Sequence, residues 1–99
     1  MKPFLINELA SEEFREAVRW YEDRRPGWGG KLFDAVGHTV DLILAHPEIG
    51  EERPGRNPSR QLPVLGFPYS VAYRIREQDI YIVAVAHAKR RPGYWKNRS

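Results

Sequence analysis

Apolar side chains recur at helical spacing in two neighbouring stretches of the first half of the chain. Residues 8–25 form the first stretch and residues 29–46 the second, and their apolar positions are Ala10, Phe14, Ala17, Val18 and Tyr21, then Leu32, Phe33, Val36, Val40, Ile43 and Leu44. Asn7 can cap the first helix, Pro26 and Gly27 separate the two, and Pro47 stops the second. Helices joined by so short a turn predict an antiparallel hairpin.

Strand patterns lie on both sides of this predicted hairpin. Residues 4–6 read as a short opening strand, and residues 48–59 contain several Gly and Pro residues and predict a loop. Further strands are expected at residues 60–65, 69–76 and 80–86. Residues 69–76 alternate between apolar and polar, as in a strand with one solvated face, whereas residues 80–86 are apolar throughout. The last strand is therefore expected to be central and shielded on both faces, and the tail from His87 leaves the sheet.

The order strand, helix, helix and three strands predicts an α+β fold. In it, an N-terminal strand and a helical hairpin pack on one face of a small antiparallel sheet. A chain of 99 residues fits one domain, residues 1–99, and can bury a core without disulfides or structural metal. We expect neither a metal nor another cofactor, since Asp34, His38 and Asp41 follow each other at helical spacing but lack a fourth ligand.

The composition favours a cytoplasmic globular protein. Hydrophobic residues make up 41% and charged residues 29% of the chain, and cysteine is absent. The longest apolar run, residues 80–86, is far shorter than the roughly 20 residues of a membrane-spanning helix, and the start of the chain lacks the apolar stretch of a signal peptide. We therefore expect no membrane partner.

Positive charge is concentrated in the second half of the chain. Residues 1–52 carry six Lys or Arg and eleven Asp or Glu, whereas residues 53–99 carry ten and two, so the halves have net charges of −5 and +8. A surface so basic attracts anionic partners such as phosphate backbones. The candidates for binding RNA or another target are Arg53, Arg56, Arg60, Lys89 and Trp95, because arginine binds phosphate and aromatic rings stack on unpaired bases.

The same half could also hold a metal-independent ribonuclease site. Such a site needs a base for the 2′-hydroxyl, cations for the charged phosphorane and an acid for the leaving oxygen. The candidate catalytic residues are His87, Arg74, Arg90, Arg91 and Tyr94. The alternative is structural: His87 ends a core strand, and Tyr94 and Trp95 pin the tail against the helices.

Several short segments, taken in order, resemble the RelE/ParE toxin superfamily. They are Ala10 to Tyr21 with Pro26-Gly27 and Phe33, His46-Pro47-Glu48-Ile49-Gly50, Phe67-Pro68-Tyr69-Ser70-Val71 with Tyr73, Ala84-Val85-Ala86-His87, Arg90-Arg91-Pro92 and Trp95. The segment around Phe67 and the histidine followed by two arginines also resemble the plasmid-stabilisation members grouped with ParE. The resemblance implies a helical hairpin on an antiparallel sheet, and a toxin that arrests growth unless its antitoxin binds it in a hetero-oligomer.

The resemblance leaves the target open. Members similar to RelE cut mRNA on the ribosome without metal, whereas members similar to ParE inhibit DNA gyrase without known catalytic residues. This chain has His87, Arg90 and Arg91 where nuclease residues would be sought, but its tail continues through Pro92 and Trp95. We therefore carry three hypotheses: ribosome-dependent mRNA cleavage, non-catalytic inhibition of gyrase, and an inactive module derived from a toxin.

Overall fold

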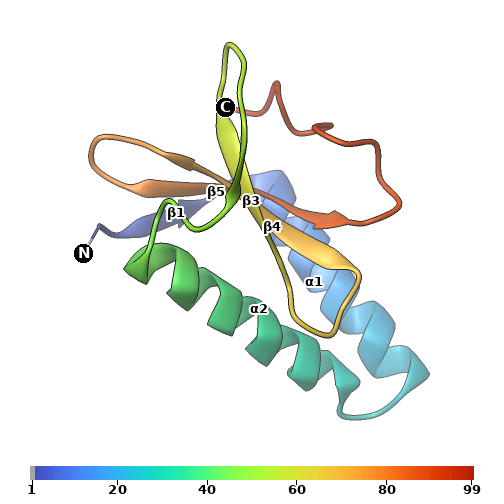
Figure 1. The fold of residues 1–99 in the computed structure, drawn as a ribbon. Helices are drawn as coiled ribbons and strands as arrows, with labels where there is room; N and C mark the ends of the chain where they lie inside the picture. The colour runs from blue at the N-terminus through green and yellow to red at the C-terminus, as the bar shows by residue number, and fades with distance from the viewer. Residues whose placement is uncertain (1) are drawn as a thin grey trace.

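The computed structural model describes residues 2–99, which form two helices and five strands. In chain order they are β1 (Phe4–Ile6), α1 (Glu8–Arg24), α2 (Trp28–Ala45), β2 (Glu51–Arg53), β3 (Ser59–Pro63), β4 (Tyr69–Ile75) and β5 (Ile80–His87) (Figure 1). The predicted helices and the strands at residues 4–6, 69–76 and 80–86 are confirmed to within one or two residues. The strand predicted at residues 60–65 begins and ends earlier.

All five strands form one sheet in the order β1-β5-β4-β3-β2. Three neighbouring pairs are antiparallel, but β1 runs parallel to β5, so the sheet is mixed, where the sequence predicted an antiparallel one. The α+β class with a helical hairpin on one face is confirmed. The prediction of a loop throughout residues 48–59 was wrong at β2, whose three exposed residues pair with the β3 backbone and carry no apolar pattern.

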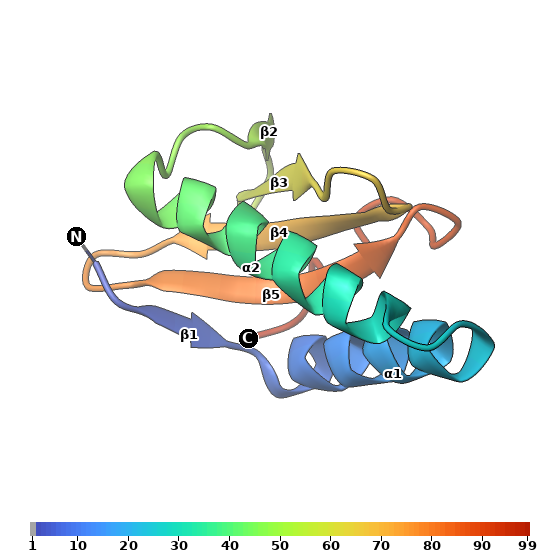
Figure 2. The same cartoon turned by 90° about the horizontal axis from the view of Figure 1, so that it is seen from below.

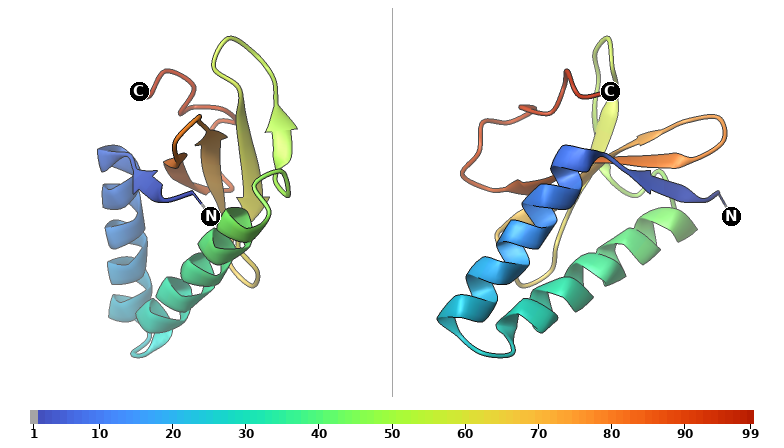
Figure 3. Two further views of the ribbon diagram at one scale, coloured as in Figure 1. Left: turned by 90° about the vertical axis from the view of Figure 1, so that its left-hand side faces the viewer. Right: turned by 180° about the vertical axis from the view of Figure 1, so that it is seen from behind.

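The two helices cover one face of the sheet. Figure 2 shows α2 crossing in front of the strands, and Figure 3 shows the helices meeting at their turn and diverging from it. The Asn7 side chain caps α1 by accepting hydrogen bonds from the N–H groups of Leu9 (2.8 Å) and Ala10 (3.3 Å). A Cβ atom at Gly29 would lie 2.8 Å from the carbonyl oxygen of Val18, so only glycine permits this close crossing.

A β-bulge in β5 decides which side chains face the helices. Ala72 pairs with Ala84 and Tyr73 with Ile82, so Val83 is an extra residue without a partner on β4. Before the bulge Ile82 packs against the helices, and after it Val85 does so, while Val83 and Ala84 belong to the opposite core. The bulge therefore reverses the alternation along the second half of β5. As predicted, β5 is central and its residues 82–86 are buried.

The tail folds back over the face of the sheet opposite the helices. Residues 88–99, red in Figure 1, form a series of turns, and the Trp95 side chain is 2% exposed. It packs in a second core with Val83 and three alanines, Ala72, Ala84 and Ala86. Because alanine side chains are small, they leave room on this face for an indole ring.

Candidate functional site

The tail is held on the sheet by Arg74. Its guanidinium group donates hydrogen bonds to the carbonyl oxygens of Trp95 (3.4 Å), Lys96 (3.1 Å) and Arg98. Burial lowers the pKa of Arg74, and its Nε atom is buried without a hydrogen-bond partner among residues 2–99. Arg74, a predicted catalytic residue, thus has its guanidinium occupied by the backbone of the tail.

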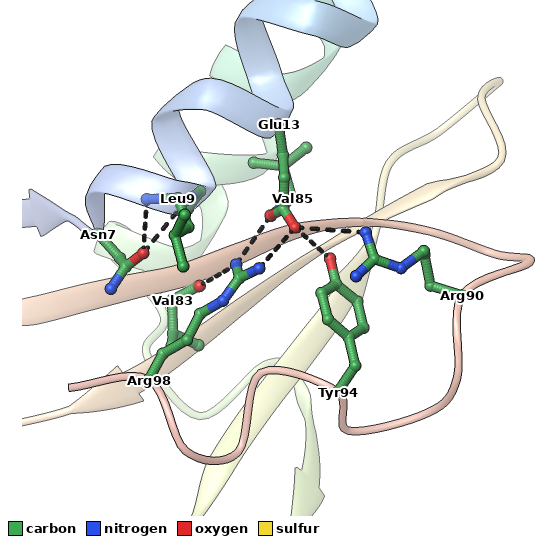
Figure 4. Close-up of polar contacts among 9 residues, drawn as sticks. Asn7, Leu9, Glu13, Val83, Val85, Arg90, Tyr94 and Arg98 are labelled. Carbon is green, nitrogen blue, oxygen red and sulfur yellow. Dashed lines mark hydrogen bonds and ion pairs between the residues drawn. The ribbon is translucent and has the colours of Figure 1, made fainter.

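A second attachment of the tail centres on Glu13 of α1 (Figure 4). Its carboxylate accepts hydrogen bonds from both terminal nitrogens of Arg98 (3.0 and 2.8 Å), from the Tyr94 hydroxyl (2.7 Å) and from the Val85 N–H (3.1 Å). The Arg90 guanidinium lies 3.8 Å away. Burial alone would raise the pKa of Glu13, but hydrogen bonds from Arg98, Tyr94 and Val85 lower it below its ordinary value. The carboxylate is therefore charged and fully engaged.

The partners of Glu13 have shifted pKa values of their own. Burial and the hydrogen bond to the Glu13 carboxylate raise the pKa of the Tyr94 hydroxyl. The same carboxylate raises the pKa of Arg98 through its hydrogen bonds. Both side chains are consequently fixed in their protonated forms. The Tyr94 hydroxyl proton is directed at Glu13 and not at solvent.

Glu13 and Arg98 also complete the edge of β5 beyond β1. The β1 pairing ends where Ile6 meets Ile82. At the next positions the Val83 carbonyl accepts a hydrogen bond from Arg98 (3.0 Å), and the Val85 N–H donates to Glu13. Two side chains thus satisfy backbone groups that a neighbouring strand would otherwise pair.

His87 lies at the end of β5, on the side of the sheet that the helices cover. It pairs with Tyr69, and the two ring centroids are 5.0 Å apart in an edge-to-face arrangement. Its Nδ1 atom accepts a hydrogen bond from the Lys89 N–H (3.0 Å), which in the neutral ring places the proton on Nε2. The ring borders a hollow of about 480 Å³ whose other lining residues include Glu13, Glu16, Trp20, Tyr21, Lys89 and Arg90.

The structure brings four of the five predicted catalytic residues together. His87, Arg90, Arg91 and Tyr94 line a smaller hollow of about 100 Å³. Arg74 is separate: it lies on the tail side of β4, five positions along the strand from Tyr69, the partner of His87, or about 17 Å. Since His87 and Arg74 occupy opposite faces as well as distant positions, they do not reach one phosphate group.

The predicted RNA-binding residues also divide into two sets. Arg53, Arg56 and Lys89 are exposed. Arg60 instead donates hydrogen bonds to the carbonyl oxygens of Glu48 (3.1 Å) and Gly50 (2.9 Å), so it braces the connection after α2. Trp95 is buried, with its indole N–H donated to the Ser59 hydroxyl (3.2 Å), and its ring is not free to stack on a base.

Sequence reasoning missed Glu13, which accepts four hydrogen bonds, and the role of its partner Arg98. Glu12, Glu13 and Glu16 all look alike as polar residues of one amphipathic helix. Glu13 and Arg98 are 85 positions apart, and no local pattern links them.

In residues 2–99 there is no cluster of three or more potential metal ligands, and no helix of this part of the chain has the length and apolar character needed to cross a membrane.

Comparison with known proteins assigns this chain to a family. The sequence profile described as "ParE toxin of type II toxin-antitoxin system, parDE" matches residues 4–92. A chain from a solved structure, the chromosomal ParDE toxin-antitoxin system from P. aeruginosa, is similar in fold with a TM-score of 0.63 and 20% identity, over 88% of this chain and 96% of that one. No curated protein matches. The profile spans most of the sequence, and the chain therefore belongs to the ParE toxin family of type II toxin–antitoxin systems.

Proposed function

We propose that this protein is the toxin of a toxin–antitoxin pair, and that it arrests growth by binding DNA gyrase and not by cutting RNA. One observation carries the proposal: the groups that could supply acid and base chemistry are already bonded within the chain. Arg74 holds the tail carbonyls, Tyr94 donates its proton to Glu13, and the Nδ1 of His87 accepts a backbone N–H.

This arrangement is poorly suited to catalysis. General-base catalysis needs an unprotonated atom that can reach the attacking hydroxyl. In the tautomer set by the Lys89 N–H, the Nε2 of His87 carries a proton and has no free lone pair. The raised pKa of Tyr94 also makes it a weak proton donor to a leaving group. The exposed cations Arg90 and Arg91 remain available, and they support binding without chemistry.

The choice of gyrase rests on the family. The resemblance described above implies gyrase as the target of ParE-like members, and it is the ParE profile that matches residues 4–92. The hollow beside His87 is a suitable docking surface because it combines the half-exposed Trp20 ring with the cations Lys89 and Arg90. Exposed aromatic and arginine side chains are the residue types that contribute most to protein interfaces.

A separate apolar groove between the diverging helices is the proposed antitoxin site. It has a volume of about 240 Å³ and is lined by residues of β1, β4, β5 and both helices, among them Phe4, Ile6, Phe14, Phe33 and Val40. The Phe33 side chain is 57% exposed and stacks on Phe14 with ring centroids 5.5 Å apart. An apolar segment of the antitoxin laid in this groove would remove these rings from water.

The test compares the two targets with the same purified protein. We expect the protein to inhibit supercoiling of relaxed plasmid by DNA gyrase, in proportion to its concentration relative to gyrase, and to leave ribosome-bound mRNA intact. His87→Ala should inhibit gyrase as well as the unchanged protein does. His38→Ala, which removes an exposed histidine of α2, is the matched control.

The opposite result would identify a nuclease. In that case mRNA would be cut at positions in phase with codons, the cuts would disappear in His87→Ala but persist in His38→Ala, and gyrase would work normally. A protein that affects neither gyrase nor mRNA would also contradict the proposal, and would leave the inactive module as the explanation.

A further inference from the structure

A further hollow, which His87 does not border, lies between the loop after β2 and the turns of the tail. Its volume is about 240 Å³, and it is lined by residues 53–57 and by residues 92, 93, 96 and 97 of the tail. Three cationic side chains, Arg53, Arg56 and Lys96, are among the lining residues, and no Asp or Glu is. All three are exposed. The hollow therefore presents positive charge that no carboxylate of its own wall neutralises.

The positive surface continues past this hollow. The small hollow that His87 borders shares Arg53 and Pro92 with it and adds Arg90 and Arg91, again without an acidic residue. Of these five cations, Arg90 alone lies within 4 Å of a carboxylate in the part of the chain that the structure describes. A row of five cations, Arg56, Lys96, Arg53, Arg90 and Arg91, thus lines two hollows that share Arg53 and Pro92.

Two contacts join the walls of the hollow, and one of them places the Arg53 guanidinium. The Asn57 amide donates a hydrogen bond to the Lys96 carbonyl (3.4 Å), joining the loop to the tail. Arg53 lies over the Trp95 ring, 5.9 Å from its centroid, and against Gly93, where a Cβ atom would be 3.1 Å from the guanidinium. Gly93 has a φ of +72°, a conformation that favours glycine. These contacts hold the loop after β2 and the turns of the tail together around the hollow.

We propose that this row of cations binds the phosphodiester backbone of a nucleic acid, without reading its sequence. Arginine and lysine side chains neutralise phosphates regardless of the bases. Trp95 is buried under Arg53 and does not reach a base, and the Tyr94 hydroxyl is bonded to Glu13. An acidic protein segment fits less well, because the hollow offers prolines and glycines where protein interfaces have large apolar side chains.

The test measures binding of fluorescent short duplex DNA and single-stranded RNA by anisotropy at several salt concentrations. The double variant Arg56→Ala with Lys96→Ala should bind about tenfold more weakly, and the slope of log K against log salt should fall by about 2, since each phosphate contact contributes about 0.9. Arg15→Ala with Arg19→Ala removes the same charge from exposed positions of α1 and is the matched control. Circular dichroism checks that both variants are folded.

The outcomes distinguish DNA from RNA as the bound backbone, and nucleic acid from an acidic protein segment. Preference for DNA or for RNA, or equal binding of both, supports the proposal and identifies the backbone that is bound. Equal weakening by the α1 control, or displacement of DNA by a polyglutamate peptide at equal charge concentration, would overturn it. The inference does not rest on gyrase as the target: a protein that inhibits gyrase but binds no nucleic acid would refute this inference alone.

Discussion

The two faces of the sheet are both buried, but by different means. On one face the helices bring apolar side chains at regular spacing, such as Leu32, Val36 and Ile43, against Val71 and Ile82. On the other face an irregular tail brings one large ring, Trp95, and is held by the polar contacts of Arg74 and Glu13. The helical face depends on many similar contacts, and the tail face on a few directional ones.

The largest loss of stability is expected when the main apolar residue of either face is replaced. Trp95→Ala and Leu32→Ala remove side chains that are 2% and 0% exposed, and each should lower the free energy of unfolding by about 3 to 5 kcal/mol. Urea unfolding followed by far-ultraviolet circular dichroism measures both without relying on tryptophan fluorescence. A loss below about 1 kcal/mol for Trp95→Ala, with the full loss for Leu32→Ala, would mean that the tail is not part of the core.

A smaller effect is expected from the polar attachment of the tail. Glu13→Gln keeps the shape of the side chain but leaves the Arg98 guanidinium, whose side chain is only 14% exposed, without its negative partner. We expect a loss of about 2 kcal/mol in the free energy of unfolding, less than for a fully buried pair. Glu16→Gln, on the same helix but exposed, should change it by less than about 0.5 kcal/mol. If Glu13→Gln lost no more unfolding free energy than Glu16→Gln, the attachment through Glu13 would contribute nothing to stability.

The smallest effect is the dependence of this attachment on pH. The pKa of Glu13 is below its ordinary value of 4.5 in the folded protein, because the hydrogen bonds from Arg98, Tyr94 and Val85 outweigh burial. The stability that Glu13 contributes is therefore full above about pH 4.5 and is lost as the pH falls through the folded pKa. The difference in unfolding free energy between the unchanged protein and Glu13→Gln should narrow as the pH falls below 4.5. A constant difference down to pH 3 would contradict this.

The helical face could be predicted from the sequence, whereas for the tail the sequence suggested only that Tyr94 and Trp95 could anchor it. Residues 8–25 and 29–46 show a helical period directly, because an amphipathic helix places apolar side chains on the same face at every turn. The tail has no period. Its position depends on Trp95 meeting alanines of β4 and β5 and on Glu13 meeting Arg98 across most of the chain, and such pairings become visible only in three dimensions.

The candidate site shows the same limit. His87, Arg90 and Arg91 lie together because they are near one another in the sequence. Unbroken alternation along β5 from Ile82 would have placed His87 on the tail face with Arg74, and the bulge at Val83 moves it to the helix side instead. Residues 82–86 are apolar at every position, so nothing in the pattern marks where the alternation changes.

The half of the β5 edge that β1 does not pair bears on how copies of the protein could associate. An open row of backbone N–H and C=O groups invites another chain to add a strand, which is a route to aggregation. Here Glu13 occupies the Val85 N–H and Arg98 the Val83 carbonyl, and each brings a charge to the edge. The two side chains therefore oppose the addition of a strand from another copy along this part of β5.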